Sequence, residues 1–142
     1  MQKDDEATRA KIAQQFIQAI PHAHALGMEI EAVGQDGAVI SMDWKEEFVG
    51  DARSGVIHGG VISALMDTCC GAAVLAQTEG AVSAATIDLR IDYMRGATPR
   101  QRITAEAQCF HVTRSVAFVR ATVTDGDEGS VATATGAFTI GR

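Results

Sequence analysis

The sequence is poor in aromatic residues, cysteine and basic charge, and each shortage excludes a class of protein. Aromatic residues make up 5% of the 142 residues. The three cysteines are an odd number and two of them are adjacent, so a disulfide framework is not expected. Twelve Lys and Arg stand against 18 Asp and Glu, which leaves a net charge of −6. Broad nucleic-acid binding needs a basic surface and is therefore excluded.

Long uncharged apolar runs are also missing. No segment reaches the roughly 18 to 20 uncharged apolar residues that cross a bilayer. The first residues, MQKDDEATRAK, are charged and contain no apolar signal segment. With 46% hydrophobic and 21% charged residues, the composition is that of a globular domain. We expect one cytoplasmic domain over residues 1–142, with residues 1–22 as an N-terminal helical extension and no membrane partner.

Hydrophobic periodicity predicts a helix, a β-hairpin, a second helix and four further strands. The first helix, residues 4–20, has an apolar stripe of Ile12, Phe16 and Ile20 and is expected to stop at Pro21. Residues 28–34 and 37–44 alternate and form a hairpin, after which residues 45–57 are polar and predict a loop. The remaining strands are predicted as a meander over residues 83–95, 102–112, 115–124 and 130–140.

The second helix, residues 59–77, differs from the rest because it is apolar on nearly every face, which is typical of a buried helix. An antiparallel sheet wrapped around this one helix fits the order of elements better than βαβ units, so the predicted class is α+β. One sheet and one helix leave a sheet face and an edge uncovered. We therefore expect a homodimer that continues the sheet, and further a dimer of dimers.

Two features of this helix can carry chemistry. Gly59 and Gly60 form a tight turn whose unpaired N–H groups, at the positive end of the helix, are suited to an oxyanion; the structural alternative is a turn alone. Asp67 is a carboxylate among apolar neighbours, so it either has a structural donor or performs chemistry. The two lie eight residues, about 12 Å, apart along one helix. One carbonyl cannot reach both, so a shared reaction predicts two antiparallel helices from two subunits.

The segment HGGVISALMDTCCGAAV, followed by TIDLRIDYMRGA, resembles the hotdog-fold acyl-CoA thioesterases of the phenylacetate-pathway (PaaI-like) type over about residues 26 to 140. The resemblance implies a hotdog fold and an acyl-CoA substrate. It implies that Asp67 is the general base or nucleophile and that the Gly59 N–H, beside Gly60, is the oxyanion donor. It further implies that Thr86 lies near the attacking water and the carboxylate, and that His58 orders the loop or transfers a proton.

One position departs from the family pattern. Many relatives carry Asn or Gln six residues before the histidine, where this sequence has Ala52 beside Asp51. Asp51 could replace the amide in contacting the substrate after a small adjustment of the loop. The departure bears on whether the protein hydrolyses a thioester or only binds it.

Arginines between residues 90 and 120 give a second signal. Six of them stand against two acids in this segment, a local charge of 6 − 2 = +4: Arg90, Arg95, Arg100, Arg102, Arg114 and Arg120. Arginine forks match phosphate oxygens, so the cluster favours binding the phosphates of coenzyme A, with Arg95 and Arg114 at strand ends as the first candidates. Salt bridges at solvated strand edges are the structural alternative for any single arginine.

We therefore expect hydrolysis of an acyl-CoA thioester to a free acid and CoA, with no cofactor and no metal. Two alternatives remain: an acyl-CoA-binding module without turnover, which Ala52 favours, and a hotdog-fold dehydratase or hydratase of acyl thioesters. The acyl group, whether aryl, arylacetyl or medium-chain, is not specified by the sequence. Cys69, Cys70 and Cys109 lack metal-ligand spacing and are expected to act as small hydrophobic residues.

Overall fold

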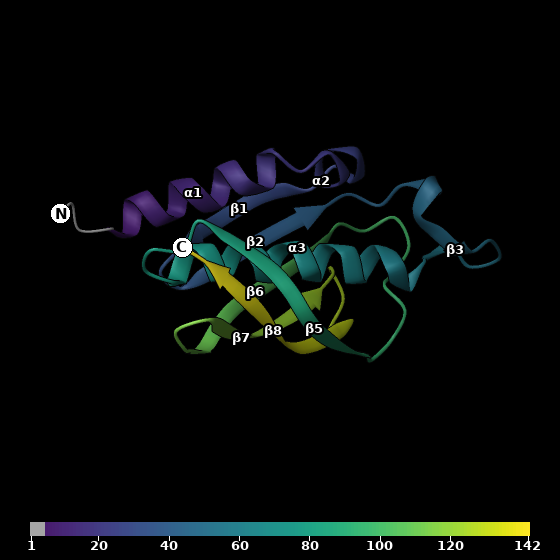
Figure 1. The fold of residues 1–142 in the computed structure, drawn as a ribbon. Helices are drawn as coiled ribbons and strands as arrows, with labels where there is room; N and C mark the ends of the chain where they lie inside the picture. The colour runs from purple at the N-terminus through teal and green to yellow at the C-terminus, as the bar shows by residue number, and fades with distance from the viewer. Residues whose placement is uncertain (1–4) are drawn as a thin grey trace.

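The computed structural model describes residues 5–142 and wraps an antiparallel sheet around one long helix (Figure 1). The first four residues of the expected N-terminal extension lie outside the described residues. Helix α1 (Glu6–Gln18) is capped by Asp5, whose side chain accepts a hydrogen bond of 2.8 Å from the Thr8 N–H. The helix packs on the central helix and buries Ala13 and Ile17 between the expected apolar positions.

Pro21 does not simply end this helix. Helix α1 stops at Gln18, and Pro21 is the first residue of a second short helix, α2 (Pro21–Leu26). Proline is well suited to the first helical position because its missing N–H would have no partner there. Pro21, expected only as the end of the first helix, is therefore also the start of α2.

Six strands form one sheet in the order β1-β2-β6-β7-β8-β5, and every neighbouring pair is antiparallel. The strands are β1 (Glu29–Gly34), β2 (Gly37–Met42), β5 (Ser83–Tyr93), β6 (Ile103–Val112), β7 (Val116–Thr124) and β8 (Ala132–Gly141). The expected meander is wrong for its first strand. Strand β5 pairs with β8 while β6 pairs with β2, so the chain crosses the sheet between β5 and β6.

The predicted loop at residues 45–57 is more ordered than expected. It holds a 3₁₀ turn (Glu46–Phe48) and a small hairpin of β3 (Val49–Asp51) and β4 (Val56–Ile57). Strands of three and two residues are too short to show an alternating pattern, which is why the sequence does not reveal them. In Figure 1 this hairpin lies at the end of the molecule away from α1's first turn.

Helix α3 (Gly59–Gln77) has the bounds that the sequence predicts. Its second half is wholly buried, from Cys69 to Ala76, and burial raises the pKa of the Cys69 thiol to about 12. Asp67 is its one charged residue, and by length and composition it could cross a membrane; here it is the core helix, covered largely by the sheet and α1. One stripe of this largely buried helix stays open or partly open: Gly60, Ser63, Ala64 and Asp67.

Candidate active site

The turn into α3 is organised by His58, which caps the helix. The Gly60 N–H donates to His58 Nδ1 over 2.8 Å, so a neutral His58 carries its ring proton on Nε2. The Val61 N–H donates to the His58 carbonyl oxygen over 3.0 Å. The Gly59 N–H is the first of the helix, so no preceding helical carbonyl can accept from it, and residues 5–142 supply no other acceptor for it. This N–H is therefore free to bind an oxyanion.

The 3₁₀ turn and the β3–β4 hairpin together hold His58 in place. The His58 N–H donates to the Phe48 carbonyl oxygen over 2.7 Å. A Cβ atom added to Gly50 in β3 would lie 2.9 Å from His58 Cα, so only glycine fits this close approach. A Cβ atom on Gly60 would likewise lie 2.9 Å from His58 Nδ1. These contacts explain why positions 50 and 60, which both lie against His58, carry glycine.

Asp51 has partners within its own hairpin. Its carboxylate accepts hydrogen bonds from the Ser54 hydroxyl at 2.7 Å and from the Arg53 N–H at 3.2 Å, and these bonds lower the pKa of the Asp51 carboxyl. Ala52 is exposed in the same turn. The contacts give Asp51 a turn-forming role, and its contact with substrate in place of an amide stays a prediction.

Asp67 and Thr86 meet across the interface of α3 and β5. The Thr86 Oγ1 donates to Asp67 Oδ1 over 2.6 Å. Asp67 is half-buried, less than its apolar sequence neighbours imply, because it lies on the open stripe of α3. The carboxylate faces an open pocket of about 310 Å³, lined by Gly60, Ser63, Ala64, Asp67, Leu89 and Ile91. The predicted pairing of carboxylate and hydroxyl is therefore present within one chain.

A β-bulge in β5 makes this pairing possible. The register of β5 with β8 shifts between Thr86 and Asp88, so one extra residue enters the strand at Ile87. Alternation places Thr86 on the face toward α3, and without the bulge Leu89 and Ile91 would point the other way. With it, both pack against the core beside Asp67. The bulge thus gathers even-numbered and odd-numbered side chains on one face.

Tyr93 is a site residue that the sequence does not reveal. Its hydroxyl donates to the Gly59 carbonyl oxygen over 3.0 Å, and a Cβ atom on Gly59 would lie 3.3 Å from its ring. Tyr93 is the last residue of β5 and is half exposed. The sequence shows only that Tyr93 is an aromatic residue inside the TIDLRIDYMR segment. Its contact with the glycine turn depends on the bulge and on the length of β5.

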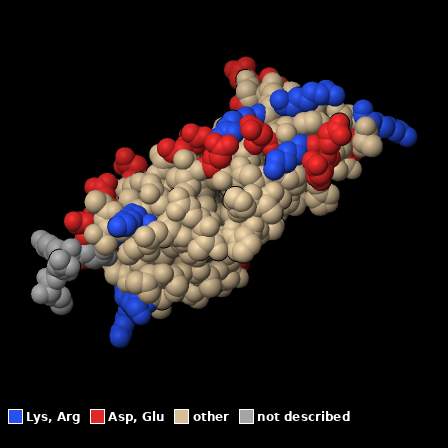
Figure 2. Space-filling model, turned by 90° about the horizontal axis from the view of Figure 1, so that it is seen from above, with Lys and Arg blue, Asp and Glu red and all other residues tan. Residues whose placement is uncertain are grey.

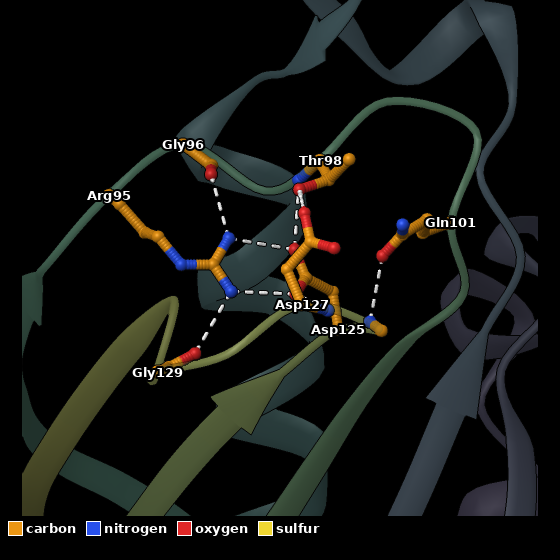
Figure 3. Close-up of polar contacts among 8 residues, drawn as sticks. Arg95, Gly96, Thr98, Gln101, Asp125, Asp127 and Gly129 are labelled. Atoms are coloured by element: carbon orange, nitrogen blue, oxygen red, sulfur yellow. Dashed lines mark hydrogen bonds and ion pairs between the residues drawn. The ribbon is translucent and has the colours of Figure 1, made fainter.

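Arg95, one of the two expected phosphate ligands, is held by a buried carboxylate (Figure 3). Its two terminal nitrogens contact the two oxygens of Asp125 at 2.9 and 2.6 Å, and also the carbonyl oxygens of Gly96 and Gly129. The Arg95 guanidinium holds the pKa of the Asp125 carboxyl well below its usual range. These contacts give Arg95 a structural role, and they weigh against phosphate binding, which stays a prediction.

The other arginines of the cluster differ in whether their guanidinium already has a partner in the structure. Arg102 contacts three acids, Glu29, Glu31 and Asp43, at 3.3, 2.8 and 2.8 Å. Arg120 lies over the Phe110 ring at 4.4 Å. Arg114 is exposed in the turn between β6 and β7, where its carbonyl oxygen accepts from Arg142, and its guanidinium has no partner among residues 5–142. Arg114 therefore stays available as a predicted phosphate ligand.

The fold and the glycine turn match a known family. The family model described as the thioesterase superfamily matches residues 54–132, a span that contains the turn, Asp67, Thr86 and Tyr93. The chain belongs to the thioesterase superfamily and has its hotdog fold.

Individual relatives agree with this assignment. The medium/long-chain acyl-CoA thioesterase YigI of Escherichia coli K12 is 26% identical, over 92% of both chains. A solved structure of a Pseudomonas aeruginosa protein is 35% identical, with a TM-score of 0.81 over 92% of this chain and 98% of that one. The Escherichia coli PaaI protein from the phenylacetic acid degradation operon has a TM-score of 0.86 over 97% of each chain; at 22% identity it supports the fold alone.

Proposed function

We propose that this protein hydrolyses an acyl-CoA thioester to a carboxylic acid and CoA. The observation that carries the proposal is the pair of chemical groups on α3: a Gly59 N–H without an acceptor in residues 5–142, and an Asp67 carboxylate aimed into an open pocket by Thr86. Membership of the thioesterase superfamily and the 26% identity to an acyl-CoA thioesterase support the substrate class.

The two groups act on one carbonyl only if two copies of the chain meet. Eight residues of helix separate Gly59 from Asp67 by about 12 Å, whereas a donor and a base each lie about 3 Å from the reacting atoms. An antiparallel pair of α3 helices would bring the open stripe of one copy to the glycine turn of the other. Strand β5 supports this pairing, because it is an edge of the sheet and carries exposed apolar Ile87.

In the reaction, the Gly59 N–H binds the thioester oxygen as negative charge develops on it. Asp67 of the other copy then takes a proton from a water molecule, whose oxygen attacks the carbonyl carbon; the carbon–sulfur bond breaks and the thiolate of CoA takes up a proton. Alternatively Asp67 attacks the carbon directly and forms an anhydride that water opens. A single turnover in ¹⁸O-labelled water separates the routes, since only the second puts label into the enzyme.

The geometry of His58 disfavours the dehydratase alternative. Its Nδ1 accepts from the Gly60 N–H at 2.8 Å, so its outer nitrogen carries the proton and is a donor rather than a base. A dehydratase needs a histidine that removes a proton, paired with an acid. His58 therefore serves best as a loop-ordering cap that presents an N–H beside the thioester.

The test is thiol release from a panel of acetyl-, octanoyl-, palmitoyl-, benzoyl- and phenylacetyl-CoA. We expect turnover on at least one of these, and the preferred member defines the acyl class. The matched control is the Asp67→Asn protein at the same concentration. Tight binding of acyl-CoA without any free thiol would instead establish the binding-module alternative.

A further inference from the structure

A second pocket, of about 440 Å³, lies beside the turn between β3 and β4. Its distinctive side chains are one tryptophan and two arginines, Trp44, Arg53 and Arg100; the rest of the lining is Glu46, Val49, Ala52, Ser54 and Gly55. Two basic side chains and one acidic side chain give the lining a charge of 2 − 1 = +1 in a protein of net charge −6. The pocket therefore differs in sign from the protein as a whole.

Arg100 is placed there by an unusual backbone. Its φ is 65°, and among residues 5–142 it is the one non-glycine residue with a positive φ. Long side chains rarely adopt this conformation, so an observed case points to a local function. The conformation places the Arg100 guanidinium over the Trp44 ring, 5.7 Å from its centroid. The ring is itself held by a hydrogen bond of 3.0 Å from Trp44 Nε1 to the Gly55 carbonyl oxygen.

Arg53 completes the pair of cations. Its side chain is exposed, and its guanidinium has no acidic partner among the residues that the structure describes. Arg95 and Arg102, in contrast, are neutralised by carboxylates at 2.6 and 2.8 Å. Figure 1 places β3 at the end of the molecule opposite the N-terminus. In Figure 2 basic side chains extend from this end, with acidic side chains beside them. The pocket arginines thus keep donors available for a ligand.

The hairpin joins this pocket to the glycine turn of α3. In β3, Gly50 approaches His58 so closely that a Cβ atom would lie 2.9 Å from His58 Cα. At the turn of the hairpin, a Cβ atom on Gly55 would lie 3.4 Å from Pro99 and 3.9 Å from Trp44. One short hairpin therefore contacts both the turn with the predicted oxyanion site and the residues that line the basic pocket. A long substrate could occupy both.

We propose that this pocket binds the phosphates of the nucleotide end of the acyl-CoA substrate, through Arg53 and Arg100. The proposal rests on the proposed function, since CoA is what joins a thioester to a phosphorylated adenosine. Each guanidinium offers a planar fork that matches two phosphate oxygens. Trp44 fixes the plane of the Arg100 fork before the ligand arrives, which reduces the ordering cost of binding. The Glu46 carboxylate lies in the same pocket and opposes the phosphates, so the arginines must outweigh it.

The experiment titrates adenosine 3′,5′-bisphosphate into the full chain by calorimetry. The variants are Arg53→Gln and Arg100→Asn, the latter because asparagine tolerates a positive φ. We expect each to weaken the Kd about tenfold, the effect of losing a charge-assisted hydrogen bond. Lys11→Ala, an exposed lysine on α1, removes the same charge outside the pocket and should bind like wild type. Unphosphorylated adenosine should be insensitive to both arginine variants.

Kinetics give the second measurement and separate the two proposals. The KM for acyl-CoA should rise in Arg53→Gln and Arg100→Asn, while the same acyl group on pantetheine, which lacks the nucleotide, should show no change. Thiol release with unchanged nucleotide affinity in both variants would overturn the pocket and leave the hydrolysis standing. Nucleotide affinity that depends on Arg53 and Arg100, without thiol release from any acyl-CoA, would support the pocket and overturn the proposed hydrolysis. A loss that follows Arg114→Ala instead would overturn the pocket in favour of the β6–β7 turn.

Discussion

Asp67 and Asp125 are two carboxylates with opposite surroundings. The Asp125 side chain is wholly buried and accepts four hydrogen bonds, two from Arg95 and one each from the Thr98 and Asp127 N–H groups. Asp67 is half-buried, accepts one hydrogen bond from the residues that the structure describes, from Thr86, and faces an open pocket. A carboxylate saturated with donors has no capacity left for a ligand or a proton. The comparison therefore indicates a stabilising role for Asp125 and supports the chemistry proposed for Asp67.

The largest expected effect is on turnover in Asp67→Asn. The amide oxygen can still accept from Thr86, so the fold and subunit pairing are kept, but the group can neither remove a proton nor attack a carbonyl. We expect kcat to fall by about 100-fold or more, the usual contribution of an acid–base group. Thiol release on the preferred acyl-CoA measures this. Turnover within a few-fold of wild type would take Asp67 out of the mechanism.

The same substitution at Asp125 should act on stability instead. Asp125→Asn removes the negative charge that pairs with Arg95. It also puts an NH₂ group, which cannot accept a hydrogen bond, against donors that now bind a carboxylate oxygen. We expect a loss of about 3 kcal/mol in the free energy of unfolding and a fall of about 10 °C in Tm. The kcat per folded molecule should be unchanged. A large fall in kcat with normal stability would reverse the roles assigned to the two carboxylates.

The pH dependence of stability tests whether the charge of Asp125 stabilises the fold. Arg95 holds the pKa of the Asp125 carboxyl below its value in the unfolded chain, about 3.9. The stabilisation is therefore complete above about pH 5 and is lost as the pH falls through the lowered folded-state pKa. The stability gap between wild type and Asp125→Asn should narrow from pH 6 to pH 2 in denaturant unfolding. A constant gap would mean that the Arg95 pair contributes no charge-dependent stability.

Thr86 should have a smaller effect, confined to Asp67. In Thr86→Val the strand and its bulge are kept and only the hydroxyl that orients the carboxylate is lost. We expect kcat to fall about tenfold, the value of a hydrogen bond to a charged group, with little change in KM. Thr86→Ser keeps the hydroxyl and is the matched control. If valine and serine give the same kcat, the 2.6 Å bond does not position Asp67.

The smallest effect is expected at the glycine turn in Tyr93→Phe. The ring stays against Gly59 and only the bond of 3.0 Å to its carbonyl oxygen is lost. A neutral hydrogen bond of this kind is worth about 1 kcal/mol, so Tm should fall by only about 3 °C, kcat should fall by a few-fold, and KM should stay close to wild type. A kcat equal to wild type would show that the helix cap alone holds the turn.

The sequence predicts the site better where the signal is local. His58 caps α3, and Gly59, Gly60 and Asp67 belong to it, so the spacing of these residues follows from 1.5 Å of rise per residue. Helix α3 keeps its predicted bounds for the same reason.

What the sequence misses depends on contacts between distant segments. The bulge at Ile87 has no residue signature, yet it decides which side chains of β5 face Asp67. The sequence does not reveal the contact of Arg95, a predicted phosphate ligand, with Asp125, because Asp125 is 30 residues away in another loop. Tyr93 reaches Gly59 only through the pairing of β5 with α3. Each of these depends on tertiary register rather than on local pattern.

The central claim is that the Gly59 turn of one copy and Asp67 of the other form one site. The direct measurement mixes two inactive proteins, one with a bulky substitution at Gly59 and one with Asp67→Asn, under subunit exchange. One of the two sites in each hybrid dimer then has both groups intact, so activity should return to about half of wild type per hybrid. Each variant alone must still dimerise and unfold cooperatively. Hybrids that are verified by mass and remain inactive would contradict the claim and place each site within a single chain.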